Sequence, residues 1–194
     1  MRAKETLPEG YREILAIDLQ KDKRLMLWVN LIGVGIALLL VVPMHFVVPI
    51  STLFDMSRGF GAYILRFAVL IAASVAYIVL HELVHAAAMR FYGCTRVKFG
   101  FTGVYAFAGS DWYFDKIAYL VIALAPVVLW GAVLAVLNGL VPTSYFWVVY
   151  LLQVTNLSGA AGDLYVTCRF ARLPRTILVG DSGVAMRVYA PPQE

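Results

Sequence analysis

Charged residues are scarce in this sequence: only 14% of its 194 residues are Asp, Glu, Lys or Arg. Soluble globular domains carry about 25%. So few charges cannot cover a water-facing surface, and the 61% hydrophobic share excludes a disordered chain. We therefore do not expect a soluble enzyme or a nucleic-acid-binding protein. The composition predicts an integral membrane protein with one compact domain.

Cysteine is rare too, since Cys94 and Cys168 are the only two in the chain. Two cysteines are too few for a disulfide scaffold. The net charge of +4 would suit a polyanion partner in a soluble protein. In a membrane protein, an excess of Lys and Arg instead reflects topology and contact with anionic lipid. The expected partners are thus membrane lipids, and no nucleic acid.

Long uncharged stretches mark the expected membrane spans. Residues 25–54 and 117–162 contain no charged side chain, and a helix needs about 20 apolar residues to cross the bilayer. The second stretch must hold two helices, because the turn-forming residues Asn138, Gly139 and Pro142 lie in its middle. The sequence predicts an all-α polytopic fold with four transmembrane helices, near residues 25–48, 62–91, 116–137 and 145–168.

Three segments follow from this assignment: an N-terminal segment (1–24), a transmembrane domain (25–168) and a C-terminal tail (169–194). In the tail, two short apolar runs flank a Gly-Asp-Ser-Gly turn, which indicates a small hairpin.

The basic residues predict the orientation of the chain. All but Arg58 and Arg66 of the 16 Lys and Arg residues lie in the N-terminal segment, in the 90–116 connection or in the tail. Because cytoplasmic loops carry the excess of Lys and Arg, we expect a multi-pass cell-membrane protein with cytoplasmic N- and C-termini.

The second expected helix contains an H-E-x-x-H pattern, with His81, Glu82 and His85. Residues at i and i+4 are about 40° apart on one helix face, so both imidazoles can bind one Zn²⁺ while Glu82 acts as general base on a water. An unpaired Glu within a membrane helix costs about 2.5 kcal/mol or more. The alternative is a pair of core histidines bonded to neighbouring helices.

A catalytic zinc site needs a third protein ligand and an open position for water. Asp163 in the fourth expected helix is the candidate, because it and His81 lie at nearly the same depth, roughly 27 and 28 Å from the outer side. The alternative for Asp163 is a charge near the membrane surface that pairs with Arg169 or Lys116.

An asparagine and a proline are also placed within the expected membrane helices. Asn156 lies two turns deeper on nearly the same face as Asp163, where its amide could bind substrate or a developing oxyanion or form an interhelical hydrogen bond. Pro126 lacks an N–H and leaves a carbonyl of the third helix without its donor; we interpret it as a kink.

Between the second and third helices, residues 96–101 and 104–107 alternate around a Thr102-Gly103 turn. This pattern predicts a short β-hairpin beside the zinc helix. A strand edge there could hold an extended peptide; the alternative is an interfacial hairpin with aromatic anchors.

On these residues the sequence resembles a family of small four-helix membrane proteins described as "putative zincin peptidase", which is distantly similar to the site-2 proteases. The resemblance is carried by the start of the chain (7–11), the H-E-x-x-H pattern, residues 99–110, 123–126 and 156–165. It implies that His81, His85 and Asp163 bind zinc, that Glu82 is the base, and that peptide bonds are cleaved in or near the membrane.

The function predicted from the sequence is therefore that of an intramembrane zinc metallopeptidase. Its catalytic residue would be Glu82, its Zn²⁺ ligands His81, His85 and Asp163, and its substrate-binding residue Asn156. The partner would be a membrane-protein or peptide substrate. The competing hypothesis is a non-hydrolytic protein, either a zinc-stabilised membrane scaffold or a small transporter.

Overall fold

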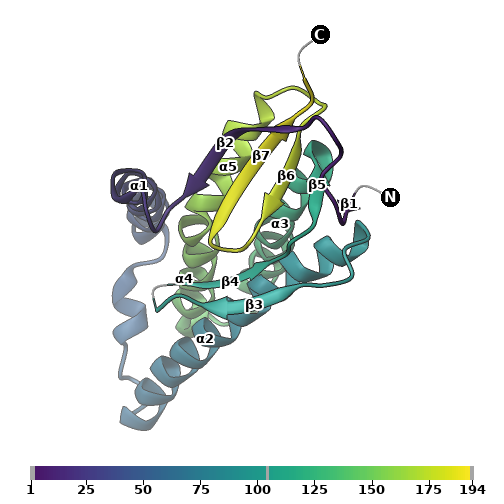
Figure 1. The fold of residues 1–194 in the computed structure, drawn as a ribbon. Coiled ribbons are helices and arrows are strands. Elements are labelled where there is room, and N and C mark those ends of the chain that lie inside the picture. Colours follow the sequence, from purple (N-terminus) through teal and green to yellow (C-terminus); the bar gives the residue numbers. More distant parts are fainter. Residues whose placement is uncertain (1–2, 104, 193–194) are drawn as a thin grey trace. The chain divides into compact units, whose positions relative to one another are not determined.

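The structure of the chain, a computed structural model, describes residues 3–103 and 105–192. It is mostly helical, and its strands cluster near both ends of the chain and before α3 (Figure 1). The helices are α1 (Lys23–Val47), the 3-10 helix η1 (Ile50–Phe54), α2 (Phe60–Phe91), α3 (Lys116–Leu140), α4 (Thr143–Gly159) and α5 (Ala161–Ala171). The strands are β1 (Ala3–Lys4), β2 (Arg12–Asp18), β3 (Lys98–Phe101), β4 (Ala106–Gly109), β5 (Tyr113–Asp115), β6 (Leu178–Asp181) and β7 (Ala185–Ala190).

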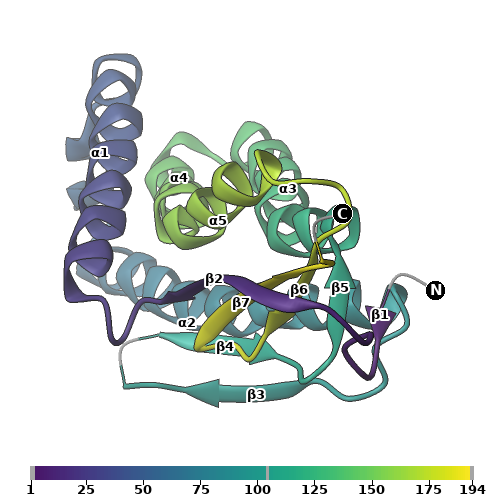
Figure 2. The ribbon, with the colours of Figure 1, turned by 45° about the horizontal axis from the view of Figure 1, so that its top comes forward.

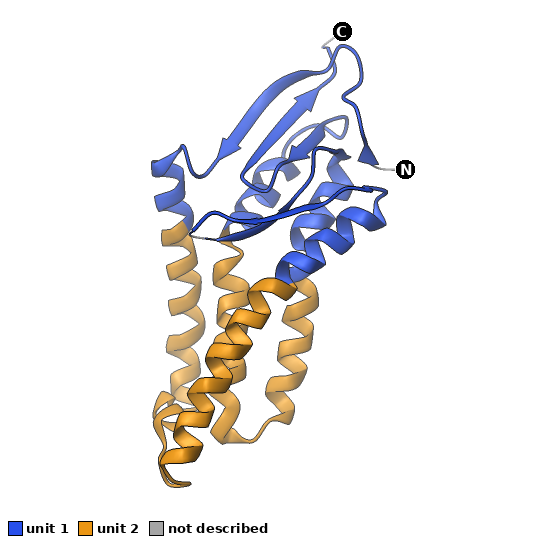
Figure 3. Cartoon of the chain, turned by 60° about the horizontal axis from the view of Figure 1, so that its bottom comes forward, with its two compact units in different colours: residues 1–29, 81–126, 162–194 blue, residues 30–80, 127–161 orange. Residues whose placement is uncertain are grey.

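The chain forms two compact units, which Figure 3 shows in different colours. Unit 1 contains residues 1–29, 81–126 and 162–194, and unit 2 contains residues 30–80 and 127–161. Each unit is thus assembled from segments that are far apart in the sequence.

Unit 1 is built on an antiparallel five-stranded sheet with the strand order β1-β5-β6-β7-β2 (Figures 1 and 2). One hydrophobic core joins the sheet to the helices of this unit, through residues such as Met89 of α2, Ile122 of α3, Phe170 of α5 and Val179 of β6. Burial of this apolar surface holds the helix ends in fixed places on the sheet.

An all-α fold is therefore an incomplete description of this chain. The expected segment before the first helix contributes β1 and β2, and β5 lies immediately before α3. These strands pair with partners more than 60 residues away, such as Phe114 with Val179 and Ile17 with Met186. Short strands that pair over such distances leave no local periodicity in the sequence.

The two expected hairpins both have counterparts in unit 1. Strands β3 and β4 pair antiparallel, with Phe99 opposite Ala108, and β6 and β7 pair in the tail, with Val179 opposite Val188. Val104, the first residue of the expected second strand, lies outside the described residues.

Unit 2 is helical and is held together by buried aromatic and polar side chains. Arg66 is only 1% exposed, and its guanidinium donates to the carbonyls of Thr52, Leu53 and Asp55. The indole of Trp147 donates to the carbonyls of Val48 and Pro49. Both side chains thereby satisfy backbone groups of the connection after α1, which cannot be left unpaired in an apolar setting.

In the described part of the chain, three helices are long and apolar enough to cross a membrane: α1, α2 and α3. Their ends lie within three residues of the expected spans. The fourth expected helix is instead interrupted at Ala160, which separates the 17 residues of α4 from α5. The interruption falls between Gly159 and Gly162, and glycine is a poor helix former.

A buried carboxylate connects the sheet of unit 1 to α3. Asp181 of β6 accepts hydrogen bonds from the Tyr119 hydroxyl (2.9 Å) and from the Gly183 N–H (2.8 Å). Burial raises the pKa of the Asp181 carboxyl above its ordinary value, although these two donors act in the opposite direction. At pH values between the unfolded-state and folded-state pKa of Asp181, the folded protein therefore keeps a proton that the unfolded chain has lost.

This pKa shift predicts a pH dependence of stability. Above about pH 4, where an unfolded Asp loses its proton, the Asp181 contribution to the free energy of unfolding should fall as the pH rises through the folded-state pKa. Asp181→Asn stays neutral, so its unfolding temperature relative to wild type should increase as the pH rises above about 4, the pKa of an unfolded Asp. Thermal unfolding in detergent at several pH values measures this, and a constant difference would contradict it.

Candidate metal centre

The H-E-x-x-H pattern lies in the part of α2 that belongs to unit 1. His81 and His85 are one helical turn apart, and their ring centroids are 4.9 Å from each other. Both residues are buried, with 9% and 8% of their surfaces exposed. The i, i+4 spacing thus places two imidazoles side by side inside the protein, as the helix geometry requires.

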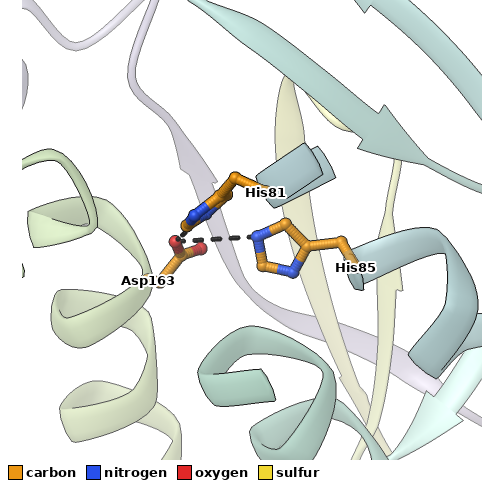
Figure 4. Close-up of side chains that lie close together, drawn as sticks. All are labelled: His81, His85 and Asp163. Atoms are coloured by element: carbon orange, nitrogen blue, oxygen red, sulfur yellow. Dashed lines mark ion pairs between the residues drawn. The ribbon is translucent and has the colours of Figure 1, made fainter. Parts of the chain in front are cut away.

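Asp163 lies with these two histidines. It belongs to the first turn of α5, and its Oδ2 atom is 3.5 Å from Nε2 of His81 and 3.7 Å from Nε2 of His85. Figure 4 shows both rings pointing toward this carboxylate. The sequence-based pairing of these three residues therefore corresponds to a real cluster.

The alternative partners of Asp163 are engaged elsewhere or are not seen beside it. The Lys116 ammonium donates to the carbonyls of Ala171 and Leu173, at the end of α5. Among residues 3–103 and 105–192, no ion pair joins Asp163 to Arg169. A cation at the carboxyl end of α5 and an anion in its first turn both agree with the helix dipole.

The donor set fits zinc. The three side chains offer ligand atoms that all lie within 4.8 Å of one another. Bonds of about 2.0–2.2 Å in tetrahedral zinc sites place ligand atoms about 3.3–3.6 Å apart, close to the separations of 3.5 and 3.7 Å here. Two imidazoles and one carboxylate are also a known ligand set of catalytic zinc, which keeps a fourth position open.

Glu82 follows His81 in α2 and turns toward the β3–β4 hairpin. Its Oε2 atom accepts a hydrogen bond of 2.7 Å from the backbone N–H of Ala108 in β4. This bond fixes the carboxylate of the expected base and places the hairpin beside the metal cluster. The sequence gives no signal for the Ala108 contact, because a backbone N–H carries no side-chain identity.

His85 has a second backbone partner. Its Nδ1 atom is 2.9 Å from the carbonyl oxygen of Ile122 in α3. A carbonyl oxygen only accepts hydrogen bonds, so Nδ1 must carry the hydrogen. In the neutral ring this leaves the Nε2 lone pair free, on the side that faces Asp163. Histidine ligands of metals commonly use such a partner to fix the tautomer.

Asn156 belongs to unit 2 and is fully buried, with 0% of its surface exposed. Its Oδ1 atom accepts a hydrogen bond from the Tyr77 hydroxyl, and its Nδ2 atom donates to the Val127 carbonyl. This is the interhelical arrangement that we gave as the alternative for this residue, and binding of substrate by Asn156 stays a prediction.

If Asp163 is a metal ligand, its removal should weaken metal binding. We expect Asp163→Ala to lower the zinc stoichiometry of the purified protein and to weaken zinc affinity, since only two protein ligands remain. Metal analysis and competition with a chelator measure both quantities.

Asp111→Ala is the matched control, because Asp111 is an exposed carboxylate of the same unit that pairs with Lys98. It should bind zinc as wild type does. Full zinc occupancy in Asp163→Ala would refute the assignment.

Comparison with known proteins adds independent information on the family. Neither the curated proteins nor the solved structures gave a match to the chain. A family model described as "Putative zincin peptidase" matches residues 74–178, a range that includes His81, Glu82, His85 and Asp163. The match covers more than half of the chain, so the protein belongs to this family, for which zinc is the implied metal.

Proposed function

We propose that this protein is an intramembrane zinc metallopeptidase that cleaves peptide bonds in or near the bilayer, as the site-2 proteases do. The observation that carries the proposal is the cluster of His81, His85 and Asp163 around one point, with Glu82 in the same helical turn. Membership of the zincin peptidase family supports hydrolysis as the reaction class.

His81, His85 and Asp163 would hold the metal through Nε2, Nε2 and a carboxylate oxygen. A zinc ion bound there would supply Lewis-acid chemistry, by polarising the scissile carbonyl and making a water more acidic. Glu82 accepts the proton from the attacking water and delivers it to the leaving amine. Its hydrogen bond to the Ala108 N–H keeps the carboxylate oriented for this role.

The β3–β4 hairpin would receive the substrate. Ala108 of β4 meets Glu82 directly, so an extended peptide that pairs with β4 lies close to the base. Cleavage requires an extended backbone, and pairing with a strand provides it with main-chain hydrogen bonds. Phe99 and Phe101 of β3 are more than half exposed, which agrees with a hairpin at an apolar boundary.

The intramembrane setting is supported by α2, which carries the H-E-x-x-H pattern and is one of the three helices suited to span a membrane. Large apolar side chains of this helix, such as Ile71 and Val75, are exposed and would face lipid. In this proposal α4 provides the fourth span, although it is shorter than the other three.

We also propose that the N- and C-terminal segments are both cytoplasmic. The five-stranded sheet takes strands from the N-terminal segment, from the 90–116 connection and from the tail. Segments that share one sheet must lie on one side of the membrane. They are also the segments that hold nearly all of the basic residues, which favours the cytoplasmic side.

Glu82→Gln tests the catalytic part of the proposal. It removes the proton acceptor but keeps the size and a hydrogen-bonding oxygen, so the variant should fold and bind zinc as wild type does. Cleavage of a transmembrane substrate in proteoliposomes should fall by about a hundredfold or more, the usual range for loss of a general base.

Cleavage by Glu82→Gln at the wild-type rate would show that Glu82 is not the base. If wild type and variant both bind zinc and neither cleaves any transmembrane substrate, the protein is better described as a zinc-stabilised scaffold.

Cysteine labelling tests the topology. In a Cys168→Ser background, Met56→Cys places a thiol in the exposed connection before α2, and Glu9→Cys places one in the exposed N-terminal segment. An impermeant maleimide should label Met56→Cys in intact cells but Glu9→Cys only after lysis. The Cys168→Ser parent gives the background from the buried Cys94. The reverse pattern would overturn the orientation.

A further inference from the structure

Helix α3 contains a proline at a position with a particular consequence for its hydrogen bonds. In an α-helix, the N–H of each residue donates to the carbonyl four residues earlier. Pro126 lies inside α3 and has no N–H, so the Ile122 carbonyl lacks its usual helical donor. Ile122 is 1% exposed, and water has little access to this group.

His85 provides the missing donor. Its Nδ1 atom lies 2.9 Å from the Ile122 oxygen, which is the oxygen that Pro126 leaves free. Figure 4 shows the other ring nitrogen of His85 turned toward Asp163. The His85 imidazole thus lies between the Ile122 carbonyl, on its Nδ1 side, and the candidate metal position, on its Nε2 side.

We propose that Pro126 is a positioning residue of the metal centre. By removing the N–H at position 126, it reserves the Ile122 carbonyl for His85, and this bond holds the ring as the Nδ1–H tautomer with Nε2 available to zinc. The inference rests on the proposed metal site, but it does not depend on peptide hydrolysis. Pro126 thereby acts on the ligand without touching metal or substrate.

A kink alone does not explain this arrangement. Bending a helix requires only that the N–H is lost, whereas here the oxygen that loses its donor is the one bonded to a candidate ligand. Pro43 in α1 makes the same chemical change in a helix that contributes no residue to the cluster found in the described chain. A comparison of substitutions at the two prolines therefore distinguishes a general effect on helix stability from an effect on the metal site.

The test is Pro126→Ala, which restores the N–H and lets it compete for the Ile122 carbonyl. Loss of an orienting hydrogen bond of a metal-bound histidine weakens metal affinity by about 10- to 100-fold. We expect Pro126→Ala to weaken zinc affinity by at least about tenfold in a chelator competition. Its unfolding temperature without metal should not decrease, because Ala is the better helix former. Pro43→Ala should leave zinc affinity unchanged.

A second measurement needs neither metal nor activity. Nitrogen-15 NMR of the metal-free protein, recorded at a pH high enough that the His85 ring is neutral, reports which ring nitrogen carries the hydrogen. Wild type should show the Nδ1–H tautomer, and Pro126→Ala should shift the ring toward Nε2–H. Equal tautomers and equal zinc affinities in the two proteins would overturn the inference while leaving the metal site intact. Absence of zinc binding by wild type would instead overturn the metal site, on which this inference rests.

Discussion

The candidate metal centre depends on holding a partly buried carboxylate beside two imidazoles. Asp163 lies between two imidazoles at 3.5 and 3.7 Å, in a setting where an unpaired charge would be very costly. The two histidines come from one turn of α2, so their spacing is guaranteed by the helix itself. Only the carboxylate must be brought from a distant segment, because Asp163 belongs to α5.

That placement depends on how α5 and α3 are attached to the sheet. The interruption at Ala160 starts a new helix just before Asp163, and Lys116 at the start of α3 satisfies the carbonyls at the other end of α5. The Tyr119–Asp181 hydrogen bond joins α3 to β6. A sheet of strands from both ends of the chain therefore supports a centre whose ligands all lie in helices.

Local chemistry explains what the sequence could predict. The i, i+4 histidines, the uncharged stretches and the alternating residues around Thr102 and Gly103 are visible in short windows. They correspond to α2, to the three helices suited to span a membrane and to the β3–β4 hairpin; the fourth expected helix is interrupted at Ala160. Asp163 could be paired with His81 because depth along a helix follows from counting residues. The sheet could not be predicted, because β5 has only three residues. Its pairing with β6 depends on a hydrophobic core whose residues are distant in the sequence and meet only as the chain folds.

The backbone partners of the centre were beyond the reach of pattern analysis for a different reason. Every residue has a backbone carbonyl and every residue except proline has a backbone N–H. No residue type therefore marks the Ala108 N–H or the Ile122 carbonyl as a partner of the centre. Proline is the exception, because it removes a donor and thereby identifies one carbonyl that needs a partner. In an apolar helix that need is strict, since water cannot meet it. A proline inside a buried, apolar helix therefore points to the residue four positions earlier, and here that residue contacts a candidate metal ligand.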